Sequence, residues 1–515
     1  MLRIYIEPSS QASNIRNVKT NYGFEWLIIL LVILMTVLVV FRDDKGLYIN
    51  DSALMYASII AMECVVLALM CLNRRNPYFA LLLIFNVIFV LLRVVTLVYF
   101  DPYSFVYRQA LSAKDYENAL AVVALLTPII GFIAYFGRYE RKKLKRPEGI
   151  VDKPGRLNIL IAIMLTSLMC NVVKRVFDGG IFYFIATYFT QIFSIGALYA
   201  ITIIYIHASP HGKYSRQLEI ALALIMILFF TLSGQKGGVF QIALTYLLVM
   251  LVFSYKTPAT LLNKFLAIGI LAFSIQLYFL GNLIRDNTHG GESLVNIILS
   301  NPVEQLSAYF DEGLSWAIGH FSERIGYLDY IARMVKNHEL YTPVISFGYY
   351  IQSFIDYMLP GTYFNVPHAN NAIVFYDTYG YFPSLSEYMD EQYHSNMFTA
   401  YGELFVLGRG LFGAALYAVF FMFLGVFVFR FLYRYIIDDF IFRVVRYFEL
   451  ALFFLFLSSF GLDWFLENVV YCAVSIPLIV VCLKLRYTVQ ISSFKHIKQL
   501  PVADHTGNFA SVIRK

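Results

Sequence analysis

The sequence predicts an all-α integral membrane protein that crosses the bilayer about twelve times. Of its 515 residues, 59% are hydrophobic and 14% are charged, and the mean hydropathy is +0.65. Soluble globular domains carry about 25% charged residues, so this composition excludes that class. Apolar runs of about 17 to 25 residues recur between charged segments, as helices require to cross a hydrocarbon core roughly 30 Å thick. The strands of a membrane barrel would alternate apolar and polar residues, and these runs do not.

The positions of the apolar runs define the expected spans. The first run is expected to be a retained helix, because no small-residue cleavage site of a signal peptide follows it. The expected spans are 24–41, 53–72, 78–100, 119–136, 157–173, 181–206, 218–232, 239–255, 265–283, 411–431, 448–462 and 469–485.

These spans divide the chain into four parts and give it a direction in the membrane. The parts are transmembrane helices in 1–284, a large loop in 285–404, further transmembrane helices in 405–486 and a tail in 487–515. Lys and Arg gather in the segments that would share one side, with eight of them between Gly137 and Arg156. Because such segments remain in the cytoplasm, both termini are expected inside and the large loop outside.

The large loop is the segment with the most room for a site. From Arg285 to Glu403 it holds four basic residues against fourteen acidic ones, with many tyrosines and phenylalanines. A few arginines in such an acidic, aromatic-rich segment indicate a pocket for an anionic, sugar-bearing ligand. The part from Pro343 to Pro383 is rich in proline and glycine and is expected to be irregular. Before it, one amphipathic helix is predicted from the spacing of Phe321, Ile325, Leu328, Ala332 and Val335.

Three basic residues are candidates for binding a diphosphate. Arg285 and Arg324 could each hold it with two hydrogen bonds, as guanidinium geometry favours, or could pair with acidic neighbours in the loop. The short turn SGQKGG places glycines around Lys236, which would let backbone N–H groups and an ammonium face one anion. The alternative for this turn is a tight helical hairpin whose lysine extends to the membrane interface.

His394 is the candidate general base, because a neutral imidazole near pH 7 can take a proton from a sugar hydroxyl. The alternative is a histidine that only makes a hydrogen bond at the membrane interface. Glu403 follows nine residues later and would lie on the opposite face of a continuous helix, so the helix has to begin after His394 for the two to cooperate. Arg93 and Glu63 lie inside predicted spans and are expected to face the helix bundle and to pair with each other.

The segment HSNMFTAYGELFVLGRGLFG, from His394 to Gly413, resembles a known signature. It is similar to the His, Asn, Glu and Gly pattern that O-antigen ligases and Wzy-type polysaccharide polymerases carry where their large periplasmic loop re-enters the membrane. SGQKGG resembles the short basic turn of the same families, with Lys236 in place of an arginine. The chain departs from the pattern at Ser395, which separates His394 from Asn396, and in glycines that come about one helical turn late.

The resemblance implies a GT-C-like glycosyltransferase in the bacterial inner membrane, with its site on the periplasmic face. It implies a polymerase that joins undecaprenyl-diphosphate-linked oligosaccharide repeat units without a metal or cofactor. The implied partners are this lipid-linked substrate, the bilayer and a chain-length regulator protein, with no nucleic acid. A ligase that moves the glycan to lipid A core and a lipid-linked oligosaccharide flippase are the alternatives. The implied roles are catalysis for His394 and Glu403, and diphosphate binding for Arg285, Arg324, Lys236 and Arg409.

Overall fold

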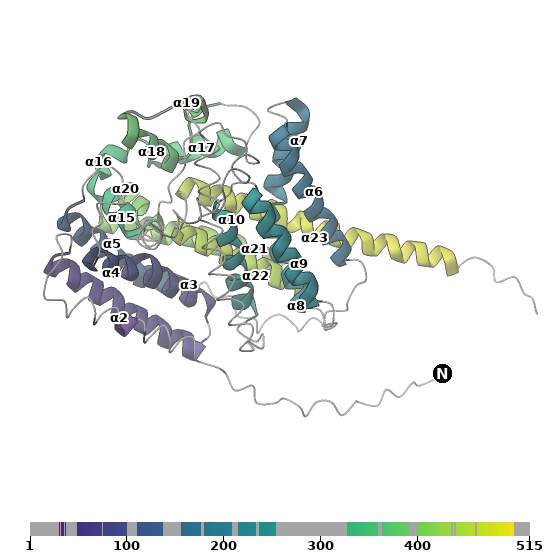
Figure 1. Cartoon of the computed structure of the whole chain (residues 1–515), viewed down its shortest axis with the longest axis horizontal. Coiled ribbons are helices and arrows are strands. Elements are labelled where there is room, and N and C mark those ends of the chain that lie inside the picture. Colours follow the sequence, from purple (N-terminus) through teal and green to yellow (C-terminus); the bar gives the residue numbers. More distant parts are fainter. Residues whose placement is uncertain are drawn as a thin grey trace, which may run out of the picture. The chain divides into compact units, whose positions relative to one another are not determined.

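The structure is a computed structural model, and the residues it describes form helices joined by turns (Figure 1). No strand occurs among them, so the all-α prediction is confirmed for this part of the chain. The described residues are 30, 32–34, 37, 49–74, 76–99, 111–136, 156–176, 180–208, 215–232, 236–253, 327–358, 363–390, 399–433, 436, 439–458 and 461–498.

Several of these helices are long and apolar enough to cross a membrane. Within the described ranges there are six of them, or seven if α7 (Gly180–Ile192) and α8 (Ile195–Ala208), bent by 41° at their junction, make one span. The protein is therefore membrane-embedded. Of the twelve predicted spans, 265–283 lies outside the described residues and 24–41 lies largely outside them. The six candidate spans are Asp51–Cys71, Pro77–Val98, Ala113–Tyr135, Arg156–Lys174, Leu411–Tyr433 and Leu462–Cys482.

The last two predicted spans have the wrong bounds. Helix α22 (Asp439–Ser458) begins at Asp439, whereas the span was predicted over 448–462. Helix α23 (Leu462–Lys498) begins at Leu462, whereas its span was predicted from 469. A span predicted from hydropathy stops at a charged residue. A helix can continue through that residue when its charge is paired. In α22, Arg446 donates to Glu449 at 2.6 Å, so both charges are accommodated along the helix.

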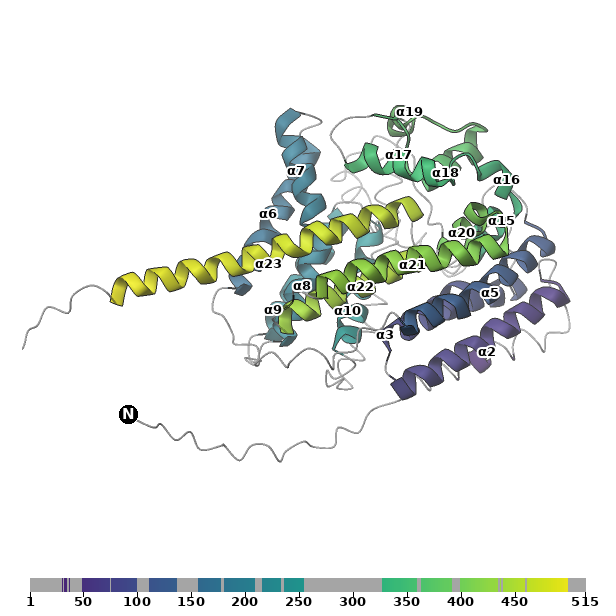
Figure 2. The same ribbon diagram turned by 180° about the vertical axis from the view of Figure 1, so that it is seen from behind.

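The chain folds into two compact units, each made of three segments. The first unit contains residues 1–136, 318–343 and 397–419. In it α2, α3 and α5 run side by side in both views, and α15 packs against α5 and α20 (Figures 1 and 2). Its helices are α2 (Asp51–Arg74), α3 (Pro77–Phe85), the π-helical η1 (Asn86–Leu91), α4 (Leu92–Tyr99), α5 (Ala113–Phe136), α15 (Tyr327–Lys336), α16 (His338–Tyr341), α20 (Ala400–Gly408) and the start of α21 (Leu411–Tyr433).

Helix α15 confirms part of the predicted amphipathic helix. Leu328, Ala332 and Val335 are all buried, at 0%, 0% and 7% exposure. The helix is described from Tyr327 onward, and the earlier positions of the predicted stripe lie outside the described residues. Its apolar face therefore packs into the first unit, as the spacing of these side chains predicts.

Arg93 does not pair with Glu63 as expected. Its guanidinium instead makes two hydrogen bonds with Asp329 of α15, from Nε at 3.1 Å and from Nη2 at 2.6 Å. Glu63 Oε2 is buried and has no hydrogen-bond partner among the described residues. The pairing prediction considered only charges within neighbouring spans, and the partner came from the predicted loop, far away in the sequence.

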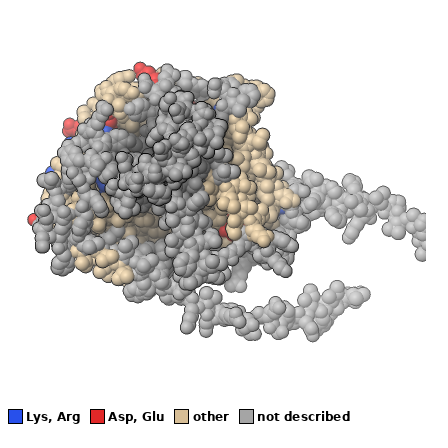
Figure 3. Space-filling view, in the orientation of Figure 1, with Lys and Arg blue, Asp and Glu red and all other residues tan. Residues whose placement is uncertain are grey.

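The second unit contains residues 137–317, 344–396 and 420–515. Its surface over α6, α7 and α9 is mainly uncharged in Figure 3, and Ile181, Phe182 and Ile185 of α7 are 70%, 64% and 57% exposed there. Such a surface suits lipid and not water. The helices of this unit are α6 (Arg156–Val176), α7, α8, α9 (Ser215–Leu232), α10 (Lys236–Val252), α17 (Phe347–Met358), α18 (Ala369–Tyr379), α19 (Leu385–Asp390), α22, α23 and most of α21.

Between Pro343 and Pro383 the described residues, which exclude 359–362, are largely helical, so the prediction of an irregular segment is wrong for them. The prolines and glycines described here lie mostly at or near the ends of short helices and do not abolish them. Pro367 stands just before α18, and Gly380 ends that helix in the left-handed conformation with φ of 83°. Pro383 precedes α19 in the same way. Helix α17 packs against α23, which brings this segment to the beginning of a candidate span.

Candidate active site around His368

The structure describes only some of the residues that the sequence nominates. Arg285, Arg324 and His394 lie outside the described residues. Lys236 is the first residue of α10, and Gly237 and Gly238 belong to the first turn of that helix. Gly237 and Gly238, which follow Lys236, are thus helical and do not form part of a loop around it.

Glu403 is fully buried within α20, at 0% exposure. The helix begins at Ala400, after His394, which is the arrangement that cooperation between His394 and Glu403 would require. Arg409 ends α20 in the left-handed conformation, with φ of 51°, and its side chain is exposed.

The glycines near Arg409 are required by the turn between α20 and α21. Gly408 and Gly413 lie backbone to backbone where α20 turns into α21, and a Cβ on Gly413 would overlap the carbonyl oxygen of Gly408. Gly410 has φ of 134°, which side chains rarely adopt. The GRG and GLFG parts of the signature therefore build a tight turn between two helices.

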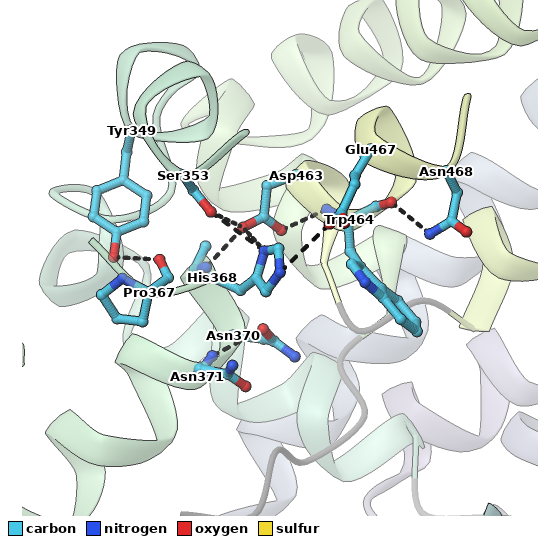
Figure 4. A network of polar contacts seen from close by, with 11 residues as sticks. Tyr349, Ser353, Pro367, His368, Asn370, Asn371, Asp463, Trp464, Glu467 and Asn468 are labelled. Carbon is cyan, nitrogen blue, oxygen red and sulfur yellow. Dashed lines mark hydrogen bonds and ion pairs between the residues drawn. The ribbon is translucent and has the colours of Figure 1, made fainter. Parts of the chain in front are cut away.

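A buried polar cluster that the sequence analysis did not nominate lies in the second unit (Figure 4). Its centre is His368, which is 9% exposed and occupies the position before the first residue of α18. Ser353 reaches it from α17, while Asp463 and Glu467 reach it from the first two turns of α23. Two helices of the predicted loop and one candidate span therefore converge on a single imidazole.

Asp463 holds the ring of His368 in one orientation. Its Oδ2 lies 3.1 Å from His368 Nδ1, and it also accepts from the Ala369 N–H at 2.9 Å and the Ser353 hydroxyl at 3.2 Å. Its Oδ1 accepts from the Trp464 N–H at 2.8 Å. A carboxylate can only accept, so the proton of a neutral imidazole is held on Nδ1 and the lone pair is left on Nε2. The four donors also satisfy a charge that would otherwise be costly to bury.

The cluster is not a serine-hydrolase triad, although it contains Ser, His and Asp. In a triad the serine and the aspartate bond to opposite nitrogens of the imidazole. Here Ser353 Oγ lies 3.2 Å from Nδ1, the same nitrogen that faces Asp463. Ser353 therefore helps to fix the ring and is not placed to be activated by it.

The second nitrogen of His368 faces another carboxylate. Glu467 Oε2 lies 3.5 Å from Nε2, longer than the usual 2.7–2.9 Å of a charge-assisted hydrogen bond. Glu467 is 5% exposed, and its Oε2 has no closer hydrogen-bond partner in the described residues. A carboxylate and an imidazole lone pair repel each other, so a proton on either group stabilises this contact, and the pair could pass that proton between a hydroxyl group, the imidazole and the carboxylate.

Aromatic and backbone contacts keep His368 from moving. The ring of Tyr357 stacks on the imidazole, with centroids 3.7 Å apart and planes inclined by 19°. Burial and the nearby carboxylates raise the pKa of Tyr357 above its ordinary value, so the phenol stays neutral. The hydroxyl of Tyr349 donates to the carbonyl of Pro367 at 2.9 Å, which anchors the residue before His368.

Asp356 anchors residues 363–367, the segment that leads into His368. Its two oxygens accept from the backbone N–H groups of Tyr363 at 2.7 Å, Phe364 at 2.9 Å and Val366 at 2.9 Å. Asp356 is 7% exposed and lies on the same helix as Ser353 and Tyr357. Helix α17 thus fixes both the approach of the chain to His368 and the ring itself.

Two asparagines follow His368 in the first turn of α18 and are labelled beneath it in Figure 4. Asn370 is 1% exposed and Asn371 is 8% exposed. The backbone N–H of Asn371 donates to Asn370 Oδ1 at 2.9 Å, and Asn371 Oδ1 is buried with no hydrogen-bond partner in the part of the chain that the structure describes. Side-chain amides offer both donors and acceptors, which suits them to sugar hydroxyls. Within the described ranges, no group of three His, Cys, Asp or Glu side chains is arranged to hold a metal ion.

One sequence signal could have identified half of this cluster. Asp463 and Glu467 stand four residues apart in an apolar segment, so they share one face of a helix. Two carboxylates on one face of a membrane helix are costly and mark a functional site by default. The predicted span 469–485 excluded both residues, so this signal was missed. His368 carried no local signal, because its partners come from other segments.

The chain matches no protein-family model, no curated protein and no solved structure.

Proposed function

We propose that this protein is a membrane glycosyltransferase that polymerises oligosaccharide repeat units carried on undecaprenyl diphosphate, as the resemblance of its His394–Gly413 segment implies. The observation that carries the proposal is the orientation of His368, whose Nδ1 lies 3.1 Å from the buried carboxylate of Asp463, so that a neutral imidazole would present its lone pair on Nε2. This is the arrangement that a general base requires to activate a hydroxyl group. This arrangement occurs in a membrane protein, and the proposed substrates are themselves anchored in the bilayer by their lipid.

In the proposed reaction, His368 Nε2 takes the proton of the acceptor sugar hydroxyl. The hydroxyl oxygen forms a bond to the anomeric carbon of the donor glycan, and the bond from that carbon to the diphosphate oxygen breaks. The electron pair leaves with undecaprenyl diphosphate. Asp463 stabilises the imidazolium that forms, and Glu467 stands beside Nε2 to pass the proton onward. Burial strengthens both electrostatic interactions.

The leaving diphosphate requires positive charge, which the His368 cluster does not provide. Arg285, Arg324, Lys236 and Arg409 are the proposed diphosphate-binding residues from the resemblance, and the rarity of basic residues in the acidic loop supports Arg285 and Arg324 as well. Removing one charge-assisted contact to a buried diphosphate costs about 2–4 kcal/mol of transition-state stabilisation, which is roughly 30- to 1000-fold in rate.

The test is polymerisation by the purified full-length protein in nanodiscs, supplied only with undecaprenyl-diphosphate-linked repeat units. We expect a ladder of lipid-linked oligomers. A product that forms only after lipid A core is added would replace the polymerase with a ligase. No product under either condition, together with movement of lipid-linked oligosaccharide across proteoliposomes, would show a flippase instead.

A further inference from the structure

Helix α17 buries polar side chains and exposes apolar ones, which is the reverse of an amphipathic helix in water. The face toward the protein carries Ser353 and Asp356, which are buried at 0% and 7% exposure. Its outward face is apolar, with Phe347 and Ile351 exposed at 44% and 43%. Phe354, Ile355 and Met358, half-buried, continue the same stripe at helical spacing. A soluble loop helix would turn this stripe inward.

The outward stripe continues onto a candidate membrane span. The ring of Phe347 contacts that of Phe420 on α21, with centroids 6.3 Å apart. Phe420, Phe423 and Phe427 lie on one exposed face of that span, at 47%, 55% and 72% exposure. Side chains that large and apolar on the outside of a span face lipid. Phe347 therefore extends the exposed apolar surface of that candidate span.

We infer that α17 is inserted in the lipid bilayer with its Phe347–Ile351 face against acyl chains, within the segment predicted to be a periplasmic loop. Its 12 residues span about 18 Å, which is too short to cross a hydrocarbon core of roughly 30 Å. It is thus a partly inserted helix that packs on α23. Polar backbone groups of such a helix are satisfied within the helix itself, as lipid requires.

This inference does not depend on the proposed reaction, but it has a consequence for the His368 cluster. Ser353, which bonds to Asp463, lies on the protein-facing side of the same helix. If lipid covers the outward face of α17, the helix alone separates the buried cluster from the acyl chains. His368 would then lie about one helix diameter from lipid. A substrate held in the bilayer by its own lipid would arrive beside the cluster without leaving the membrane.

The experiment compares two labelled positions of the second unit in nanodiscs. Ile351→Cys on α17 and the control Thr378→Cys, an exposed polar position on α18, each receive a bimane fluorophore. Quenching is measured with nitroxide-labelled phosphatidylcholine in the bilayer and with iodide in solution. The parent protein, labelled in the same way, gives the background from its half-buried Cys170 and Cys482.

We expect the lipid nitroxide to quench position 351 at least several-fold more than position 378, and iodide to show the reverse order. Equal access of iodide to both positions would overturn the inference, because α17 would then face water. Shielding of position 351 from both quenchers would also overturn it, because a protein surface would then cover the stripe. Phe347→Cys repeats the measurement on the same stripe if Ile351→Cys fails to fold.

Discussion

Arg93 and Asp329 form a buried ion pair that joins a candidate membrane span to a helix of the predicted loop. Two hydrogen bonds, at 3.1 and 2.6 Å, connect the guanidinium to both carboxylate oxygens. The two side chains are 2% and 7% exposed, and the residues are 236 positions apart in the sequence. Thr96 accepts a further hydrogen bond from Arg93 Nη1 at 3.3 Å. The pair therefore fixes α15 against η1 and α4 within the first unit.

We predict that Arg93→Ala or Asp329→Ala destabilises the protein by about 3–5 kcal/mol, because either change leaves one charge buried without its partner. The double variant Arg93→Met with Asp329→Leu should recover most of the loss, since neither charge remains. Denaturant unfolding in bicelles measures both effects.

Lys114→Ala is the control for these variants. It removes a cation from the Lys114–Glu117 pair, in which the lysine side chain is 67% exposed, and exposed pairs contribute little. Its unfolding midpoint should stay close to that of the parent protein. A single Arg93 variant as stable as this control would show that the buried pair carries no stability.

We predict that His368→Gln lowers polymerisation turnover by roughly 100- to 10,000-fold, because an amide is a very poor base. Donor binding should change little, since the diphosphate is assigned to other residues. His394→Gln is measured beside it, because the resemblance implies that His394 is the base. The measurement is turnover of both purified variants beside a donor-binding assay. If the His394 variant loses turnover and the His368 variant keeps it, the base is His394.

Asp356→Asn tests whether α17 positions His368 through the backbone. An amide has one acceptor oxygen in place of two, so at least one of the three N–H groups that Asp356 binds loses its partner, at a cost of about 1–3 kcal/mol. We expect faster hydrogen exchange at Tyr363, Phe364 or Val366, and lower kcat with little change in KM.

Glu387→Gln is the matched control for Asp356. Glu387 also accepts a backbone N–H, from Ser384 at 2.7 Å, but it is exposed and lies outside the His368 cluster. That hydrogen bond holds its pKa below the usual value. The control should leave exchange at Val366 and turnover unchanged. Equal losses in both variants would assign the effect to general loosening of the segment.

We predict that Gly413→Ala is strongly destabilising, because a Cβ there would overlap the carbonyl oxygen of Gly408 and no side-chain movement can relieve a backbone overlap. The cost should exceed the 1–3 kcal/mol typical of overpacking. Gly348→Ala in α17 is the control, since a Cβ there meets nothing within 4 Å and alanine favours helix. Folded protein recovered by size exclusion after mild heating separates the two. Equal recovery would refute the close approach.

Hydropathy and periodicity in the sequence predicted several of the helices that are long and apolar enough to cross a membrane. Apolar runs are a local property, so the spans from Ala53 to Leu72 and from Leu411 to Phe431 fall inside observed helices. The stripe of Leu328, Ala332 and Val335 predicted a buried helical face for the same reason. The prediction of an irregular segment failed at α17 and α18. It took prolines and glycines as signs of irregular structure, whereas here they mark the ends of helices that pack on other parts of the chain.

The partners of the polar residues were decided only by the tertiary structure. His368 and Asp463 are 95 positions apart, and no spacing rule joins a loop histidine to a carboxylate at the start of a later span. Arg93 illustrates the same point, because its neighbours in the sequence suggested Glu63 and the fold supplied Asp329. A buried charge must find a partner, but its own sequence neighbourhood does not specify which one. That choice depends on how helices distant in the sequence pack together, which one-dimensional patterns do not record.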